Sequence, residues 1–195
     1  WKLCRTNRNC FSADTANRPP DGRALRGSGS TIIGGMIGIV SDTHDNLDAV
    51  RKAVRLFKDA GCSLIIHAGD FVAPFSAREF GQAGIPLRAV YGNCDGEKRG
   101  LADAIAPFGT IHEPPLVLRI ENLSVAVVHK DADAREQAAS GAYDVVIFGH
   151  THKPEAGREG RTLLVNPGEA GGWVSGRKTI ALLDPKDRSA DIIPL

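Results

Sequence analysis

The hydrophobic pattern from residue 36 onward begins with a strand and an amphipathic helix. An apolar run at 36–40 predicts a buried strand at 36–41. Apolar residues between Leu47 and Phe57 then recur with the 3.6-residue period of a helix, with Asn46 placed as its cap and Gly61 at its end. Together the two segments form a strand-to-helix unit, which is typical of sheets with parallel strands.

The same alternation continues to residue 107. The predicted segments are strands at 64–68 and 87–91 and helices at 74–83 and 98–107. Parallel strands need a crossover connection between them, and a helix usually supplies it. This part of the chain is therefore expected to form a largely parallel sheet.

The pattern changes after Pro114-Pro115. The later segments are a hairpin of strands at 116–120 and 124–129, a helix near 132–141, a buried strand at 144–148, and short strands at 162–165, 178–184 and 190–193. Helical units first and hairpins later favour an α/β fold with four layers, an α/β/β/α sandwich in which two packed mixed β-sheets are flanked by helices. No internal repeat is visible.

Residues 1–35 show no periodic apolar pattern. They carry six basic residues against two acidic ones, together with Pro19-Pro20, and predict a disordered N-terminal arm. The only methionine, Met36, opens the first apolar run, so we expect a native start there and a non-native extension before it. An Arg-rich organelle transit segment is the alternative. The folded domain is expected to span residues 36–195.

Composition narrows the functional classes. The net charge of the 195-residue chain is +1, and residues 36–195 alone carry 18 basic and 21 acidic side chains, so no stable nucleic-acid binding is expected. No apolar run is long enough to cross a bilayer, which predicts no membrane association. The four cysteines lack CxxC spacing. They indicate a reducing, cytoplasmic location rather than a disulfide framework.

Acidic, amide and imidazole side chains directly follow four of the predicted strands. The segments are 41–46, 69–70, 92–95 and 149–152. Because neighbouring strands end on one rim of a sheet, these groups should converge. Asp42/His44 and His150/His152 have i, i+2 spacing, which in an extended segment directs both side chains to one side. Mixed Asp and His donors suit Mn, Fe, Co, Ni or Zn better than calcium.

These motifs resemble those of the calcineurin-like metallophosphoesterases. The family pattern is DxH, GD, GN followed by His or Cys, a lone His, and GHxH; here it reads Asp42-Thr43-His44, Gly69-Asp70, Gly92-Asn93-Cys94-Asp95, His129 and Gly149-His150-Thr151-His152. The GNCD form and a late Asn166-Pro167-Gly168 resemble the branch of small single-domain phosphodiesterases. One departure is that Lys130 follows the lone His, where the family usually has Gly.

The resemblance implies a two-metal site and assigns its ligands. The first metal would be held by Asp42, His44 and His152, the second by Asn93, His129 and His150, with Asp70 bridging both. A hydroxide between the metals would attack a small phosphodiester, nucleotide-derived ones included, without a covalent intermediate. Manganese is the preferred metal, with Ni, Co, Fe, Zn and Mg as alternatives.

Three residues are expected to take part in catalysis, namely Asp70, Asn93 and Cys94. Cys94 occupies the place where many relatives have a His that donates a proton to the departing oxygen. A thiol with an ordinary pKa is a weak donor, which favours aryl diesters over alkyl monoesters as substrates.

Several roles stay open at this point. A structural role is expected for His67 and His112, a helix cap for Asp45 and Asn46, and a turn or loop-bracing role for Asp95; Glu169 and Trp173 either shape a substrate mouth or form a surface turn. The functional alternatives are a non-catalytic scaffold, because a subunit of the retromer coat resembles this branch, and a phosphomonoesterase or nucleotide pyrophosphatase. A homo-oligomer is also left open.

Overall fold

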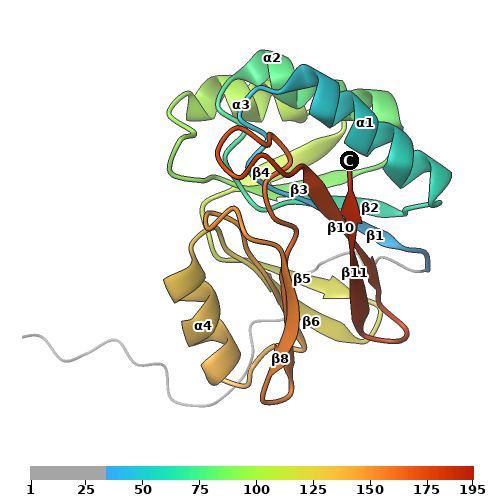
Figure 1. The fold of residues 1–195 in the computed structure, drawn as a ribbon, viewed down its shortest axis with the longest axis vertical. Coiled ribbons are helices and arrows are strands. Elements are labelled where there is room, and N and C mark those ends of the chain that lie inside the picture. The colour runs from blue at the N-terminus through green and yellow to red at the C-terminus, as the bar shows by residue number, and fades with distance from the viewer. Residues whose placement is uncertain (1–33) are drawn as a thin grey trace, which may run out of the picture.

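The computed structural model describes residues 34–195, and residues 1–33 of the arm expected at 1–35 lie outside the described residues. Two mixed β-sheets pack face to face, with α1, α2 and α3 on the outer side of one sheet and α4 on the outer side of the other (Figure 1). The predicted four-layer α/β/β/α architecture is confirmed.

The elements follow one another in a mixed α/β order. They are β1 (Ile37–Val40), α1 (Leu47–Asp59), β2 (Leu64–His67), α2 (Pro74–Ala77), a 3₁₀ helix η1 (Arg78–Ala83), β3 (Leu87–Val90), α3 (Lys98–Ile105), β4 (Gly109–His112), β5 (Leu116–Ile120), β6 (Leu123–Val127), α4 (Asp131–Ala139), β7 (Val145–Ile147), β8 (Glu155–Glu159), β9 (Thr162–Asn166), β10 (Thr179–Asp184) and β11 (Ser189–Pro194). No helix among these is long and apolar enough to cross a bilayer.

Each sheet has a parallel centre. The first sheet has the order β11-β10-β1-β2-β3-β4. Strands β1 to β4 are parallel to one another, whereas β10 is antiparallel to β1 and β11 is antiparallel to β10. The second has the order β5-β6-β7-β9-β8, with β6, β7 and β9 parallel and an antiparallel strand at each edge. The carboxyl ends of the parallel strands are the places where the motif residues follow.

The main core lies between the two sheets. Ile37 and Ile39 of β1 face Val125 and Val127 of β6 in one buried cluster. The intervening positions face the outer helices, where Phe57 of α1 is fully buried. Because the central strands are covered on both faces, they read as continuous apolar runs rather than as an alternation.

Three details differ from the sequence expectations. The helix expected at 74–83 is a short α2 followed by η1, which ends at Gly84 with φ 67°. Strands β4 and β8 were not predicted. Both lie at sheet edges, and β8 reads Glu-Ala-Gly-Arg-Glu with no large apolar residue, so the hydrophobic pattern gives no signal there.

Gly38 in β1 provides a test of the helix-on-sheet packing. A Cβ at this position would lie 2.5 Å from Cδ1 and 2.7 Å from Cε1 of Phe57. We expect Gly38→Ala to lower the free energy of unfolding by about 1–3 kcal/mol, because the ring cannot move without disturbing the core. Gly157→Ala in β8, where a Cβ meets nothing within 4 Å, is the matched control and should change stability by less than about 0.5 kcal/mol in urea denaturation. Equal effects would contradict this packing.

Candidate metal centre

The predicted site residues meet where strand ends of the two sheets come together. Asp42 and Asp70 follow β1 and β2 of the first sheet, and His129 and His150 follow β6 and β7 of the second. Two contacts cross between the sheets at this point. His129 Nδ1 lies 2.8 Å from the carbonyl oxygen of Ala68, and the His150 N–H donates to Asp42 Oδ2 at 3.1 Å.

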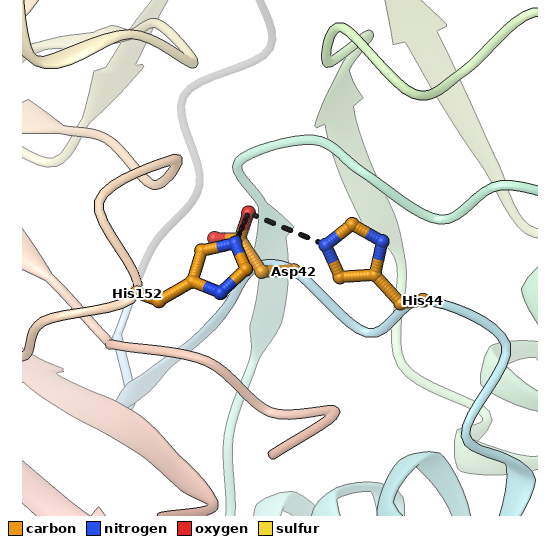
Figure 2. A group of neighbouring side chains, drawn as sticks. All are labelled: Asp42, His44 and His152. Carbon is orange, nitrogen blue, oxygen red and sulfur yellow. Dashed lines mark ion pairs between the residues drawn. The ribbon is translucent and has the colours of Figure 1, made fainter. Parts of the chain in front are cut away.

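One cluster is centred on Asp42, which is fully buried. His152 Nε2 lies 3.4 Å and His44 Nε2 3.9 Å from Asp42 Oδ1, and both rings point toward this oxygen in Figure 2. Asp42 Oδ1 and His44 Nε2 are buried and have no hydrogen-bond partner among the described residues. Lone pairs that face one another without a partner fit a divalent cation, and these three residues are a metal-binding group by distance.

A second cluster is centred on Asp70. Its Oδ2 lies 3.4 Å from His129 Nε2 and 3.8 Å from His44 Nε2, so this oxygen stands between the two clusters. Asn93 Oδ1 lies 2.9 Å from the same His129 nitrogen. A carbonyl only accepts hydrogen bonds, so His129 donates through Nδ1 to Ala68 and directs Nε2 into the site.

His150 lies at the edge of this arrangement. Its ring centroid is 5.1 Å from that of His129, and its side chain is exposed. Whereas His152 turns toward Asp42, His150 turns toward the second cluster. The structure thus brings all seven predicted ligands to one rim, with His150 and Asn93 the two exposed ones.

Burial shapes the electrostatics of the two carboxylates. Burial raises the pKa of Asp42. It acts on Asp70 in the same direction, but hydrogen bonding and charge from His129 outweigh it and lower the Asp70 pKa to about 2. Burial likewise opposes protonation of His129, yet Asp70 raises the His129 pKa. The two carboxylates offer oxygen atoms within 4.8 Å of one another. Two buried carboxylates at this distance favour a cation beside them.

The backbone of the site is strained. Nine non-glycine residues in the described part have positive φ, and five are predicted ligands, namely Asp42, His44, Asp70, His150 and His152, with φ between 40° and 67°. The sequence interpretation assumed that the i, i+2 pairs lie in extended segments. This is wrong, because left-handed residues turn the chain within each pair. Such strain costs of order 1–3 kcal/mol per residue and is typical of functional sites.

Glycines permit the close approach of these loops. A Cβ on Gly69 would lie 2.7 Å from His129 Nδ1, and one on Gly149 would lie 2.7 Å from Asp42 Oδ2. A Cβ on Gly92 would collide with the carboxylate of Asp70. A side chain at any of these positions would push a predicted ligand away.

This donor set and fold agree with a match to a known protein family. Residues 36–188 match the calcineurin-like phosphoesterase superfamily domain. The chain belongs to this superfamily. The metal-binding character of the site agrees with the family and with the donor groups found in the structure.

Named relatives of this calcineurin-like chain include archaeal and bacterial proteins. It is 37% identical to phosphodiesterase MJ0936 of Methanocaldococcus jannaschii over 156 residues, which cover 78% of this chain and 94% of the relative. It is 28% identical to phosphodiesterase YfcE of Escherichia coli over 142 residues, covering 66% and 75%. A solved archaeal phosphodiesterase superposes with a TM-score of 0.78 at 36% identity, covering 82% and 99%.

The fold is also shared with Vps29. The structure from Chaetomium thermophilum superposes with a TM-score of 0.60 at 16% identity, covering 83% of this chain and 96% of that one. At this identity the likeness shows the fold alone.

Buried side chains around the site hold its loops. Asp95 accepts hydrogen bonds from the backbone N–H groups of Asp70, Val72 and Gly92 at 2.8–2.9 Å, so it braces two loops rather than forming only a turn. Asn166 donates to the carbonyl of Gly149 at 2.9 Å and so holds the GHxH loop. These contacts fix where the predicted ligands point.

The two non-motif histidines lie apart from the metal clusters. His67 is fully buried, stacks on Phe71 with ring centroids 3.5 Å apart, and accepts from the N–H of Gly69. Burial lowers the pKa of His67 well below the usual range, so its ring is neutral. Its Nε2 lies 3.2 Å from Thr43 Oγ1, and the ring therefore links the Thr43 and Gly69 loops. His112 is exposed on β4, with Nε2 3.0 Å from Thr110 Oγ1.

The two residues expected to cap α1 behave differently. Asn46 does so, since its Oδ1 accepts from the N–H of Ala49 at 3.2 Å. Asp45 does not, and the expectation for it is wrong. Its Oδ1 accepts from the N–H of Ala73 and from Ser76 Oγ at the start of α2, because the left-handed turn at Asp45 carries its side chain toward the neighbouring loop.

Glu169 is the site residue that sequence reasoning missed. It was expected in a substrate mouth or a surface turn, but it is fully buried. Its Oε1 lies 3.5 Å from His152 Nδ1, the nitrogen that faces away from Asp42. A carboxylate behind a ligating His fixes the ring and raises its basicity. A Glu after Pro-Gly carries no sequence signal for this role.

Cys94 stands at the open side of the site. Its thiol is grouped with His44 and Asp70 within metal-binding distances, and its Sγ accepts from Asn93 Nδ2 at 3.3 Å. Partial burial and the charge of Asp70 raise its pKa to about 11.

Glu169→Gln tests the contact behind His152. The negative charge facing His152 is lost, while the single amide oxygen can keep the bonds to Ser175 that Glu169 Oε2 now accepts. We expect the dissociation constant for Mn²⁺ to rise about 10- to 100-fold in calorimetric titration, the usual effect of removing such a partner. Glu113→Gln, which removes a carboxylate from an exposed ion pair with Lys98, is the control. Unchanged Mn²⁺ affinity in Glu169→Gln would limit Glu169 to holding its loop.

Proposed function

We propose that this protein hydrolyses small phosphodiesters at a site that binds two divalent metals, with Mn²⁺ as the working metal. The observation that carries the proposal is the pair of clusters around Asp42 and Asp70, with buried acceptor atoms that have no partner among the described residues. Relatives named phosphodiesterases, one of them 37% identical along 94% of its length, support the diester as substrate class.

The proposed ligand sets follow the two clusters. Asp42, His44 and His152 would hold one metal, and Asn93, His129 and His150 the other; Asp70, whose Oδ2 faces both His44 and His129, would be shared. When bound, two such metals supply a hydroxide nucleophile at neutral pH and neutralise charge on the phosphoryl oxygens.

The protein's own groups set the charge and orientation of this site. The Cys94 N–H donates to Asp70 Oδ1 at 2.7 Å, which leaves the other Asp70 oxygen free to face the histidines. Asn93 contributes a neutral amide, so the anionic donors are limited to Asp42 and Asp70.

Cys94 bears on how the leaving group is protonated. A thiol is a weak hydrogen-bond donor and has no positive charge to offer. The departing oxygen then receives little help from the protein, which favours groups that leave as stable anions. Aryl phosphodiesters meet this condition better than alkyl monoesters.

A non-catalytic scaffold is the competing function, because Vps29 structures share the fold. The observation that argues against it is the complete set of seven candidate ligands on one rim. Hydrolysis by the metal-loaded protein separates the two functions: a folded protein that binds metal and hydrolyses no phosphodiester or phosphomonoester would favour the scaffold.

Metal removal tests the proposed chemistry. We expect about two divalent metals per chain, loss of bis(4-nitrophenyl) phosphate hydrolysis on chelation, and recovery with Mn²⁺. Asp70→Asn should lower kcat/KM far more than His67→Gln, because His67 touches no predicted ligand side chain. Full activity after exhaustive chelation would overturn the proposal, and equal losses in two folded variants would overturn the ligand assignment.

Cys94→His tests the leaving-group argument. We expect the variant to hydrolyse monoesters up to about 10²-fold faster than the wild type, because an imidazolium donates a proton where the thiol cannot. This gain is the lower end of the usual contribution of general-acid catalysis. The variant should lose its gain as pH rises through the imidazole pKa, because only the imidazolium donates the proton. A folded variant with both metals and no gain at any pH would assign Cys94 to packing.

A further inference from the structure

The loop between β9 and β10 exposes two large apolar side chains in sequence. Trp173 is 66% exposed and Val174 77% exposed, although apolar side chains of this size gain stability from burial. In the described residues the other exposed large hydrophobics, Phe75 and Val117, stand singly. The apolar surface of the indole is therefore not used in packing the domain.

This loop is nevertheless held firmly from beneath. The buried carboxylate of Glu169 accepts from the N–H of Val174 at 2.9 Å, the N–H of Ser175 at 2.8 Å and Ser175 Oγ at 2.7 Å. Hydrogen bonds to a charged group are among the stronger ones in proteins. The backbone on the carboxyl side of Trp173 thus has a fixed position.

The other side of the loop is tied to the metal centre itself. The Gly171 N–H donates to the carbonyl of Asp42 at 2.9 Å, and Asn46 Nδ2 donates to the carbonyl of Gly171 at 2.8 Å. The Trp173 indole Nε1 donates to the carbonyl of His44 at 3.0 Å. One edge of the ring is bound to the backbone of a proposed metal ligand, while most of the ring remains open to solvent.

We propose that Trp173 is a specificity-determining residue that stacks an aromatic ring of the substrate. The inference rests on the proposed function and names its substrate class, phosphodiesters in which an aryl group or a nucleobase lies within a few bonds of the phosphorus. An indole offers a large flat face, and its hydrogen bond to the His44 carbonyl holds the ring against the backbone of a proposed metal ligand. Because the ring is already fixed, stacking costs little side-chain entropy.

A protein partner is the less suitable occupant of this surface. Stable protein interfaces bury about 800 Å² on each side, far more than two adjacent side chains offer. The hydrogen bond to the His44 carbonyl also ties the indole to a site loop rather than to an independent face of the domain. We therefore assign an aromatic ring of the substrate as the occupant of this surface.

The test compares ligands that differ only in an aromatic ring. Inhibition constants against methyl 4-nitrophenyl phosphate hydrolysis are measured for phenyl phosphate against methyl phosphate, and for adenosine 5′-monophosphate against ribose 5-phosphate. The wild type should bind the aromatic member of each pair about 3- to 10-fold more tightly, the usual strength of an aromatic pair. The first pair reports aryl recognition and the second nucleobase recognition.

Variants of the loop separate stacking from other effects. Trp173→Ala should bring both ratios to about one, and Trp173→Phe should keep part of them because a ring remains without the N–H. Val174→Ala removes exposed apolar surface without a π face and should leave both ratios unchanged. In a Trp1→Phe background, indole emission comes from Trp173 alone, and adenosine 5′-monophosphate should quench it more than ribose 5-phosphate does.

Distinct outcomes overturn the inference and the proposed function. Ratios near one in the wild type, ratios unchanged in Trp173→Ala, or a shift of that variant to a smaller oligomer in gel filtration would each overturn the stacking role. Failure to hydrolyse any diester with Mn²⁺ would overturn the proposed function, while the fluorescence titration would still report on ring binding.

Discussion

Two carboxylates buried where the two sheets meet are the constraint on which this site depends. Asp42 and Asp70 are almost fully inaccessible, and they face imidazoles from both sheets. An unpaired carboxylate in the interior is costly, so the surrounding structure must either neutralise it or hold a cation beside it. The histidines, the glycines and the strained turns are arranged around this need.

The strain in the site loops is held by buried polar groups that touch backbone rather than substrate. Asp95 braces the turns after β2 and β3, Asn166 braces the turn after β7, and Glu169 lies behind His152. Each satisfies N–H or carbonyl groups that a left-handed turn would otherwise leave unpaired. The position of a predicted ligand thus depends on a second set of residues that never contacts the proposed metals.

One side of the centre is closed and the other is open, and this asymmetry bears on the proposed chemistry. The carboxylates are buried, while Cys94, His150 and Trp173 are exposed. In the proposed function the exposed side chains of Cys94 and Trp173 meet the organic part of the substrate, and the buried donors hold the metals that act on phosphorus.

The sequence by itself determined the α/β/β/α architecture and the motif residues, because buried strands and helices leave period-dependent hydrophobic patterns and because ligand types cluster at strand ends. Tertiary structure alone decided the rest. Edge strands β4 and β8 bury too little apolar surface to leave a pattern. Glu169 lies beside His152 only because β9 and β7 pair. Asp45 accepts a hydrogen bond at the start of α2 only because its turn is left-handed. Contacts between residues distant in sequence depend on strand order and on turn conformation, which no local pattern encodes.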